Sequence, residues 1–284
     1  MKQIGIIGLG LMGGSLGLAL KRRAPHISVV GYARRAETCE AALTMGAVDF
    51  VAVSPSDAAR GSDLVVLCVP VLKLGEMARA CLSGLQAGAV LTDVGSTKQD
   101  VIVEIDPVLW GLGVQFVGSH PIAGSEESGI EASREDLYSD ATVVVTPAAD
   151  NTPEGVARVV AFWELLGARV ETMTAERHDA LVARTSHLPH LVAAALAGSV
   201  CRTADEIAPL CGTGFRDTTR IASGSAEIWH DIVRTNRAAI QVELAAFAAS
   251  VDTLRQLIAE EDDKGVHDFL DECRTRRLMV LGSE

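Results

Sequence analysis

A glycine pattern close to the N-terminus constrains the fold more than any other feature of the chain. Gly8-Leu-Gly10-Leu-Met-Gly13 directly follows the apolar run 4–7 and opens a helical pattern over residues 11–22. In this spacing the first glycine permits a tight turn, the second lets a pyrophosphate approach the backbone, and the third lets helix and strand pack closely. The helix N-terminus then offers N–H groups and a positive dipole end to phosphates. The pattern predicts a dinucleotide site; the alternative is a tight turn without a ligand.

Strand-like runs recur along the first half of the chain, with helical patterns between most of them. Leu64–Val69 is apolar throughout, which is typical of a strand buried on both faces. A helix over 36–45 is closed by Gly46. The predicted strands are 4–7, 28–32, 64–69, 89–92, 114–117 and 142–145. This alternation predicts an α/β fold with a doubly wound parallel sheet, the Rossmann architecture.

The pattern changes near residue 174. No strand-like run follows Arg169–Met173, and one long helix is predicted over 175–200, disturbed only at Pro189. A second long helix is predicted over 237–260. Its apolar residues, from Ile240 to Ile258, alternate in spacing between four and three and form a stripe that needs a partner surface. We therefore predict a dinucleotide-binding domain over 1–173 and a helical domain over 174–284.

Charge and composition exclude several classes of partner. The formal net charge is −12, which argues against nucleic acid or an anionic membrane as the main partner. An anionic substrate would then require arginines within its site. The six cysteines form no C-x-x-C pair, the N-terminus is unlike a signal peptide, and the Ala-rich run 191–201 is too short to span a bilayer. A cytoplasmic protein without a membrane segment is expected.

The end of the second strand bears on the choice of cofactor. A site that prefers NAD places Asp or Glu after the strand to hold the ribose 2′-hydroxyl, but here Ala33 follows Tyr32 and precedes Arg34 and Arg35. Two guanidiniums without a carboxylate favour the 2′-phosphate of NADP. The alternative is two solvated arginines and bound NAD. The predicted cofactor contacts are Gly8, Gly10, Leu11, Met12, Gly13, Ala33, Arg34, Arg35, Val69, Pro70 and Ser96.

Two segments that contain candidate catalytic side chains follow predicted strands. Asp93-Val-Gly-Ser96-Thr-Lys98 and Gly118-Ser-His120-Pro should therefore lie at the carboxyl edge of the sheet, where ligands of this fold bind. His120 could accept a proton from a substrate hydroxyl near neutral pH. Turnover should then fall on acidification through the ordinary pKa of histidine, about 6.5. The alternatives are a helix N-cap for Ser96 and an ordinary hydrogen-bonded histidine for His120.

The helical half contributes a third segment and a pair of histidines. Arg220 could grip a substrate carboxylate, or it could form a surface pair with Asp217, three residues before it. His187 and His190 lie three apart on one predicted helical face. Without a nearby carboxylate or a third histidine we do not expect a metal there.

These motifs together resemble the prephenate/arogenate (cyclohexadienyl) dehydrogenase family along almost the whole chain. The resemblance rests on Gly8-x-Gly-x-x-Gly13, Gly95-Ser-x-Lys98, Ser119-His-Pro-Ile-Ala-Gly-x-Glu126, Ser186-His-Leu-Pro-His190, and Phe215-Arg-Asp-x-Thr-Arg220 with Trp229. It implies oxidative decarboxylation of a cyclohexadiene to 4-hydroxyphenylpyruvate or tyrosine, with hydride transfer to NAD(P). It also implies a helical C-terminal domain that forms a homodimer, with the active site between the two domains.

The resemblance assigns roles to individual residues. His120 as base and Ser96 would bind the ring hydroxyl, and Arg220 would bind the side-chain carboxylate. His187 would line the pocket. The remaining predicted substrate contacts are Ser125, Glu126, Asp217 and Trp229. Glu126 is a candidate partner for the ammonium of arogenate, but no residue here separates prephenate from arogenate.

Two other functions fit parts of the sequence. A 3-hydroxyacid dehydrogenase also begins with Gly-Leu-Gly-x-Met-Gly, but it would need a catalytic lysine on a Gly-rich helix where this chain has Ser186-His-Leu-Pro-His190. A nucleotide-sensing protein whose helical domain only dimerises would bind nucleotide without turning over any cyclohexadienyl acid, and Ser96, His120 and Arg220 would then have no chemical role.

Overall fold

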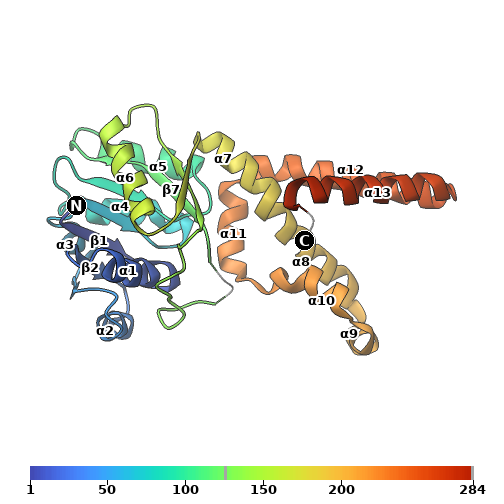
Figure 1. The fold of residues 1–284 in the computed structure, drawn as a ribbon, viewed down its shortest axis with the longest axis horizontal. Coiled ribbons are helices and arrows are strands. Elements are labelled where there is room, and N and C mark those ends of the chain that lie inside the picture. Colours follow the sequence, from blue (N-terminus) through green and yellow to red (C-terminus); the bar gives the residue numbers. More distant parts are fainter. Residues whose placement is uncertain (125–126, 283–284) are drawn as a thin grey trace. The chain divides into compact units, whose positions relative to one another are not determined.

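The computed structural model describes residues 1–124 and 127–282, with only the backbone for residues 203–205. Within these residues the N-terminal part contains a six-stranded parallel sheet in the order β3-β2-β1-β4-β5-β6 (Figure 1). Its strands are β1 (Gln3–Ile7), β2 (Ser28–Tyr32), β3 (Phe50–Val51), β4 (Leu64–Leu67), β5 (Val90–Asp93) and β6 (Gln115–Phe116). This confirms the predicted Rossmann sheet.

Helices cover both faces of the sheet because successive strand residues point to opposite sides. Ile4 and Ile6 pack in a core with α1 and α6, whereas Ile7 packs in a second core with α3, α4 and α5. Both cores are buried and aliphatic, apart from a few aromatic side chains such as Trp163. The helices are α1 (Leu11–Arg23), α2 (Ala36–Thr44), α3 (Pro55–Ala59), α4 (Leu74–Cys81), α5 (Gln99–Leu109) and α6 (Pro153–Leu165), with a 3-10 turn η1 (Val71–Lys73) before α4.

One predicted strand belongs to a different sheet. Thr142–Val145 was expected in the parallel sheet, but β8 (Thr142–Thr146) lies at the centre of a separate three-stranded sheet, β7-β8-β9. It pairs antiparallel with β7 (Gly118–Ile122) and parallel with β9 (Arg169–Thr172). The run Val143–Val145 is buried in either arrangement, so its apolar pattern indicates a strand and not which strand it pairs with. β6 is also shorter than predicted and ends at Phe116.

The helix expected over 175–200 is helical throughout but contains a wide turn. α7 (Ala175–Val182) passes into a π-helical turn, η2 (Ala183–His187), and then into α8 (Leu188–Val200). The disturbance predicted at Pro189 lies in the turn that leads into it, Ala183–His187. Proline has no N–H to donate to the carbonyl four residues before it, so the preceding turn rearranges.

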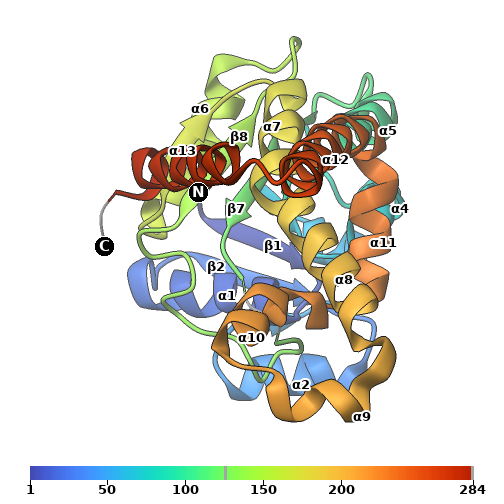
Figure 2. The same ribbon diagram turned by 90° about the vertical axis from the view of Figure 1, so that its right-hand side faces the viewer.

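Short helices complete the first compact unit of the chain, Met1–Arg237. α11 (Ala226–Thr235) lies alongside η1, which brings the helical segment against the parallel-sheet domain (Figure 2). The other elements are η3 (Cys201–Thr203), α9 (Ala204–Ile207), η4 (Ala208–Leu210), α10 (Thr213–Thr219) and η5 (Arg220–Ser223).

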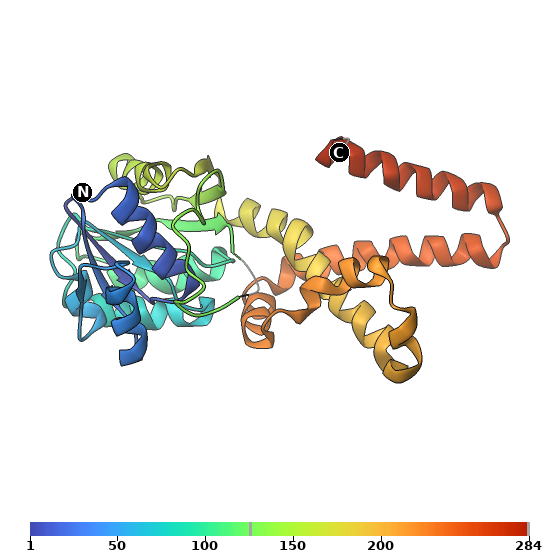
Figure 3. The ribbon, with the colours of Figure 1, turned by 60° about the horizontal axis from the view of Figure 1, so that its bottom comes forward.

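The second unit, Ala238–Glu284, contains two long helices. α12 (Arg237–Ala259) is followed by a turn, from which α13 (Asp263–Leu281) runs in the opposite direction (Figure 3). The contacts thus divide the chain after Arg237, and the sequence-based boundary at 173 stays a prediction. Among the described helices, none is both long and apolar enough to cross a membrane.

Candidate functional site

The glycine-rich turn forms a cradle with no room for side chains at two of its glycines. Gly8 has φ +102°, and its N–H donates to the Tyr32 carbonyl at 2.8 Å. A Cβ on Gly8 would lie 2.2 Å from the Cys68 carbonyl oxygen, and one on Gly13 would lie 1.8 Å from the Gly8 carbonyl oxygen. In contrast, no described atom lies within 4 Å of a Cβ built on Gly10, the N-cap of α1. The turn is therefore closed on the protein side and open where a diphosphate would meet the helix N-terminus.

The other predicted cofactor residues lie at the same edge of the sheet. Leu11 and Met12 open α1 after β1, Ala33–Arg35 follow β2, and Val69 and Pro70 follow β4. Because β2, β1 and β4 are parallel neighbours, their carboxyl ends share one edge. Arg34 and Arg35 are exposed, and their side chains make no hydrogen bond or ion pair with the described residues.

A buried ion pair shapes the turn that carries Ser96. Lys98 and Asp93 are both fully buried, and the Lys98 Nζ atom binds the Asp93 carboxylate. The same carboxylate accepts the N–H of Gly95 at 2.8 Å and that of Ser119 at 3.0 Å. A buried charge is tolerated only when paired and hydrogen-bonded in this way. The pair thus joins the Ser96 turn to the strand that bears His120.

Ser96 is half-buried, and its hydroxyl makes no hydrogen bond with the described residues. It does not cap the next helix, because α5 begins at Gln99 and its N-cap is Lys98. The N-cap alternative for Ser96 is therefore wrong. The hydroxyl is available for a ligand.

His120 lies on β7 and not in a loop after a strand, as its sequence position had indicated. The strand is anchored beside it: the Ser119 hydroxyl donates to the Asp93 carbonyl at 2.6 Å and accepts from Trp163 Nε1 at 3.0 Å. The Nδ1 atom of His120 lies 2.8 Å from Nε2 of His178, whose Nδ1 lies 2.8 Å from a carboxylate oxygen of Asp179. His120 thus ends a chain of three polar side chains that the sequence did not reveal.

The carboxylate at the end of this chain sets the protons along it. An ionised carboxylate only accepts, so His178 donates to it through Nδ1. When His178 is neutral, its other ring nitrogen, Nε2, has a lone pair and accepts from Nδ1 of His120. Nε2 of His120 is then left with a lone pair, as a base requires. Burial, and then Coulombic repulsion between a protonated His120 and His178, Lys98 and His187, holds the pKa of His120 well below its usual 6.5.

A second cluster of rings lies on the helical side. His190 stacks on Trp229 with ring centroids 3.4 Å apart and 11° between the planes, and His187 meets the same indole edge-on at 6.1 Å. His187 is buried, and its Nδ1 lies 3.2 Å from the amide nitrogen of Asn236. Burial lowers the pKa of His187 to about 4. Both histidines of the Ser186-His-Leu-Pro-His190 motif therefore contact Trp229.

Asn236 connects this cluster to the His120 chain. Its amide donates to the Asp179 carbonyl at 2.8 Å while it contacts His187. Arg220 begins η5, which packs against α8, the helix of His190, and Asp217 lies on α10. Both side chains are exposed. The convergence of His120 and Arg220 on one substrate stays a prediction, and Ser125 and Glu126 lie outside the described residues.

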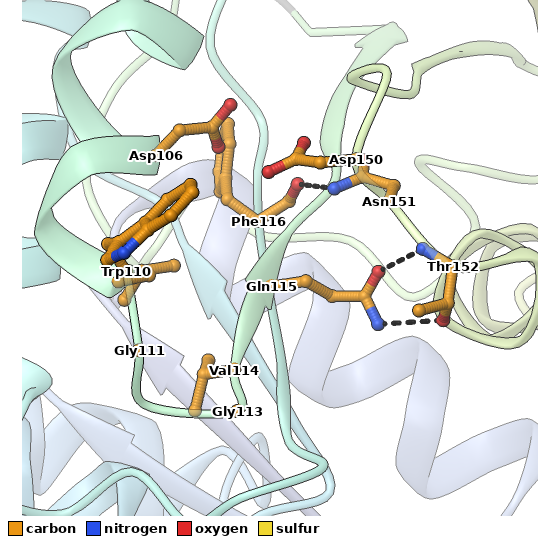
Figure 4. Close-up of a pocket in the computed structure, with 11 residues that line it drawn as sticks. Asp106, Trp110, Gly111, Gly113, Val114, Gln115, Phe116, Asp150, Asn151 and Thr152 are labelled. Atoms are coloured by element: carbon orange, nitrogen blue, oxygen red, sulfur yellow. Dashed lines mark hydrogen bonds between the residues drawn. The ribbon is translucent and has the colours of Figure 1, made fainter.

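A pocket of about 270 Å³ lies elsewhere, at β6 and the loops beside it (Figure 4). Its lining includes Asp106 of α5, Trp110 and Asp150, and the Gln115 amide holds Thr152 through two hydrogen bonds. None of the predicted site residues that the structure describes lines it. This pocket is separate from the candidate site.

The sequence motifs omitted His178, Asp179 and Asn236. His178-Asp179 lies within a helix of mixed polar and apolar residues and gives no local sign that both side chains are buried. A buried carboxylate is rare unless it is paired, so only the folded chain distinguishes this Asp from a surface one. Asn236 is hidden in the same way at the end of α11.

Comparison with known proteins gives matches along the chain. A model described as prephenate dehydrogenase, nucleotide-binding domain, matches residues 16–172, and one described as prephenate dehydrogenase, dimerization domain, matches residues 174–272. The cyclohexadienyl dehydrogenase of Zymomonas mobilis is 35% identical, over 98% of this chain and 96% of its own length.

Solved structures agree over the same length. The prephenate dehydrogenase of Aquifex aeolicus, in complex with hydroxyphenyl propionate and NAD+, superposes with a TM-score of 0.90 at 31% identity, covering 99% of this chain and 98% of its own. The Synechocystis arogenate dehydrogenase gives a TM-score of 0.85 at 30% identity, covering 98% and 100%. With both family models matched and the fold shared from end to end, the chain belongs to the prephenate dehydrogenase family.

Proposed function

We propose that this chain is a nicotinamide-dependent dehydrogenase that oxidatively decarboxylates prephenate, arogenate or both in tyrosine biosynthesis. The observation that carries the proposal is the orientation of His120, whose Nδ1 is engaged by His178 and whose Nε2 is left to accept a proton. Relatives named for these activities match nearly the whole chain, which supports the same chemistry here. The match of both family models argues against the 3-hydroxyacid alternative.

The reaction needs one base and two anchors. A nicotinamide dinucleotide held at the glycine turn would supply the acceptor for the hydride that leaves the hydroxyl-bearing ring carbon. Nε2 of His120 takes the hydroxyl proton as this happens, with Ser96 donating to the same oxygen. The bond to the ring carboxylate then breaks, carbon dioxide leaves, and the electron pair makes the ring aromatic. His120 returns its proton to the phenolate, so its role is general acid and base, worth about two to four orders of magnitude in rate.

Arg220 would hold the side-chain carboxylate, and the ring cluster of Trp229, His190 and His187 would line the far side of the substrate. Asp217, Ser125 and Glu126 are the remaining proposed contacts. A carboxylate bound by a guanidinium is a strong, directional anchor, and it compensates for the net charge of −12. Positioning of this kind supplies much of the rate of a hydride transfer.

A four-way assay tests the function. Prephenate and arogenate are each supplied with NAD and with NADP, and the reduced cofactor is followed by absorbance. We expect turnover of at least one acid, and a kcat about two to four orders of magnitude lower in His120→Asn. Nucleotide binding without turnover of either acid would instead support the non-catalytic nucleotide-sensing alternative.

We propose NADP as the preferred cofactor. The open turn at Gly10 fits a dinucleotide, and the exposed Arg34 and Arg35 beside Ala33 suit a 2′-phosphate. Replacing both arginines with alanine should lower kcat/KM for NADP about tenfold or more and leave that for NAD nearly unchanged. Arg255→Ala, on α12, is the matched control. A loss of equal size with both cofactors would contradict this preference.

We also propose a homodimer and a cytoplasmic location. The second unit exposes apolar side chains along α12, including Leu244, Phe247, Val251 and Ile258. A stripe of this kind requires a partner surface, and the family model over 174–272 is named for dimerisation. The six cysteines are all free thiols, as expected in a reducing compartment.

A further inference from the structure

We propose that Asp179 is a positioning residue that orients both proposed catalytic side chains, His120 through His178 and Ser96 through the N-terminus of α5. Asp179 is fully buried on α7, and both of its carboxylate oxygens are engaged. Oδ1 lies 2.8 Å from Nδ1 of His178 and accepts the N–H of Lys98 at 2.8 Å. Oδ2 accepts the N–H of Gln99 at 2.9 Å. A carboxylate so bound has little freedom to rotate.

Asp179 on α7 caps the N-terminus of α5. The first N–H groups of a helix lack partners within it, and negative charge is favoured there. The N-cap of α5, Lys98, cannot serve, because its ammonium group only donates hydrogen bonds, and it donates to Asp93. Asp179 therefore fills this role from α7. It fixes the backbone two residues after Ser96, and Thr97 is held in turn by a 2.8 Å hydrogen bond to Thr235.

Asp179 also orients the imidazoles of His178 and His120. The rings of His120 and His178 meet edge to face, with centroids 5.1 Å apart and 76° between the planes. Because Asp179 accepts from His178, the direction of donation along the chain is fixed and ends with the lone pair on Nε2 of His120. The Asp179 backbone is itself held by Asn236 at 2.8 Å. One carboxylate thus sets the proton on the base and the turn that carries the hydroxyl.

An asparagine at position 179 cannot both cap α5 and accept the hydrogen bond from His178. Its amide has one accepting and one donating atom, in place of two acceptors. With the oxygen at the Oδ1 position, the donor faces the Gln99 N–H and that cap bond is lost. With the amide turned over, it donates to Nδ1 of His178, which reverses the chain and leaves a proton on Nε2 of His120. His178→Asn is the matched variant, because it can still donate to Asp179 and keeps the cap while removing the acceptor for His120.

Steady-state kinetics distinguish the role of Asp179 toward His120 from its role toward Ser96. This test rests on the proposed function. We expect both variants to lower kcat with little change in KM, and Asp179→Asn to lose about tenfold more than His178→Asn. The excess should vanish when both are compared in a Ser96→Ala background, since it acts through Ser96. Equal losses in the two single variants, or an excess that persists without Ser96, would overturn the dual role.

Nitrogen NMR of the seven histidines tests the orientation without substrate. In the wild-type protein the His120 signals, identified by their loss in His120→Asn, should show a protonated Nδ1 and an unprotonated Nε2 at pH 8. This measurement needs neither turnover nor a folded Asp179 variant, so it stands if the dehydrogenase assay fails. A proton on Nε2 in the wild type would overturn the proposal.

Discussion

His120 must be neutral to accept a proton, and its surroundings favour that form. The half-buried ring loses solvation on charging, and Lys98 and the neighbouring histidines oppose a further positive charge, so its pKa lies well below 6.5. The sequence alone had placed the acid limb of activity near the ordinary value. The surroundings of His120 in the structure instead favour an acid limb at lower pH.

The pH profile follows directly. The base is active when unprotonated, so activity is retained as pH falls through 6.5 and is lost only as pH falls through the lowered pKa. We expect the acid limb of kcat/KM well below pH 6.5, measured with enzyme that regains full activity on return to neutral pH. A midpoint at or above 6.5 would contradict the assigned surroundings of His120.

Arg220 allows a prediction that separates binding from chemistry. Its guanidinium is exposed in the absence of substrate, so its contribution is estimated at the low end for a charge-assisted contact, about 2 kcal/mol. Arg220→Ala should raise KM about 30-fold and change kcat little. Arg216→Ala, four residues earlier on α10, is the control. An effect on kcat alone would remove Arg220 from substrate binding.

At the scale of elements, two carboxylates lie together where α5 meets the loop before α6. Burial, and then the charge of Asp150, raise the pKa of Asp106 to about 6. The folded state therefore holds a proton more tightly than the unfolded chain between about pH 4 and 6. Above that range, the ionised Asp106 lowers the free energy of unfolding.

Asp106→Asn should therefore stabilise the protein at pH 7.5, by about 1 kcal/mol after allowing for the partial exposure of the carboxylate. The gain should fade towards pH 4.5, and urea unfolding at both pH values measures it. Asp100→Asn, in the first turn of the same helix, should give no gain, since a charge there favours the helix dipole. A destabilised Asp106→Asn at pH 7.5 would show that the two carboxylates are not in conflict.

Sequence patterns predicted elements well where the local signal was complete. The glycine turn, β2 and α1 depend on residues next to one another, and their bounds agree closely with prediction. The strand that Thr142–Val145 pairs with depends on packing, and it was mispredicted. The wide turn has a local cause, the Pro189 that the sequence had marked, and only its place, Ala183–His187, was not predicted. Burial of His178 and Asp179 could not be predicted either, because it arises only where α7 meets α5 and β7. The sequence motifs thus identified His120, which would contact the substrate, but not His178 and Asp179, which hydrogen-bond to it in series.

For the whole molecule, we propose that the apolar face of α12 is the dimer interface. Phe247 is 39% exposed and Ile258 is 61% exposed, which is unusual for apolar side chains at helical spacing along one helix. If a second copy covers this face, Phe247→Asp should shift the mass measured by light scattering from that of a dimer to that of a single chain. Gln256→Asp, a polar exposed position on the same helix, should leave the mass unchanged. A dimeric Phe247→Asp protein would exclude this face from the interface.

The three tryptophans of the chain lie in three different environments. Trp163 is enclosed in the core, Trp110 is 83% exposed, and Trp229 is stacked on His190. An imidazolium quenches indole emission by electron transfer, so the fluorescence of Trp229 should depend on the charge of His190. It should also change when another aromatic ring displaces His190 from the stack. A difference spectrum between the wild type and Trp229→Phe isolates that signal. The stacked pair thus gives the enzyme a built-in optical sensor for events at its own site, with no added label.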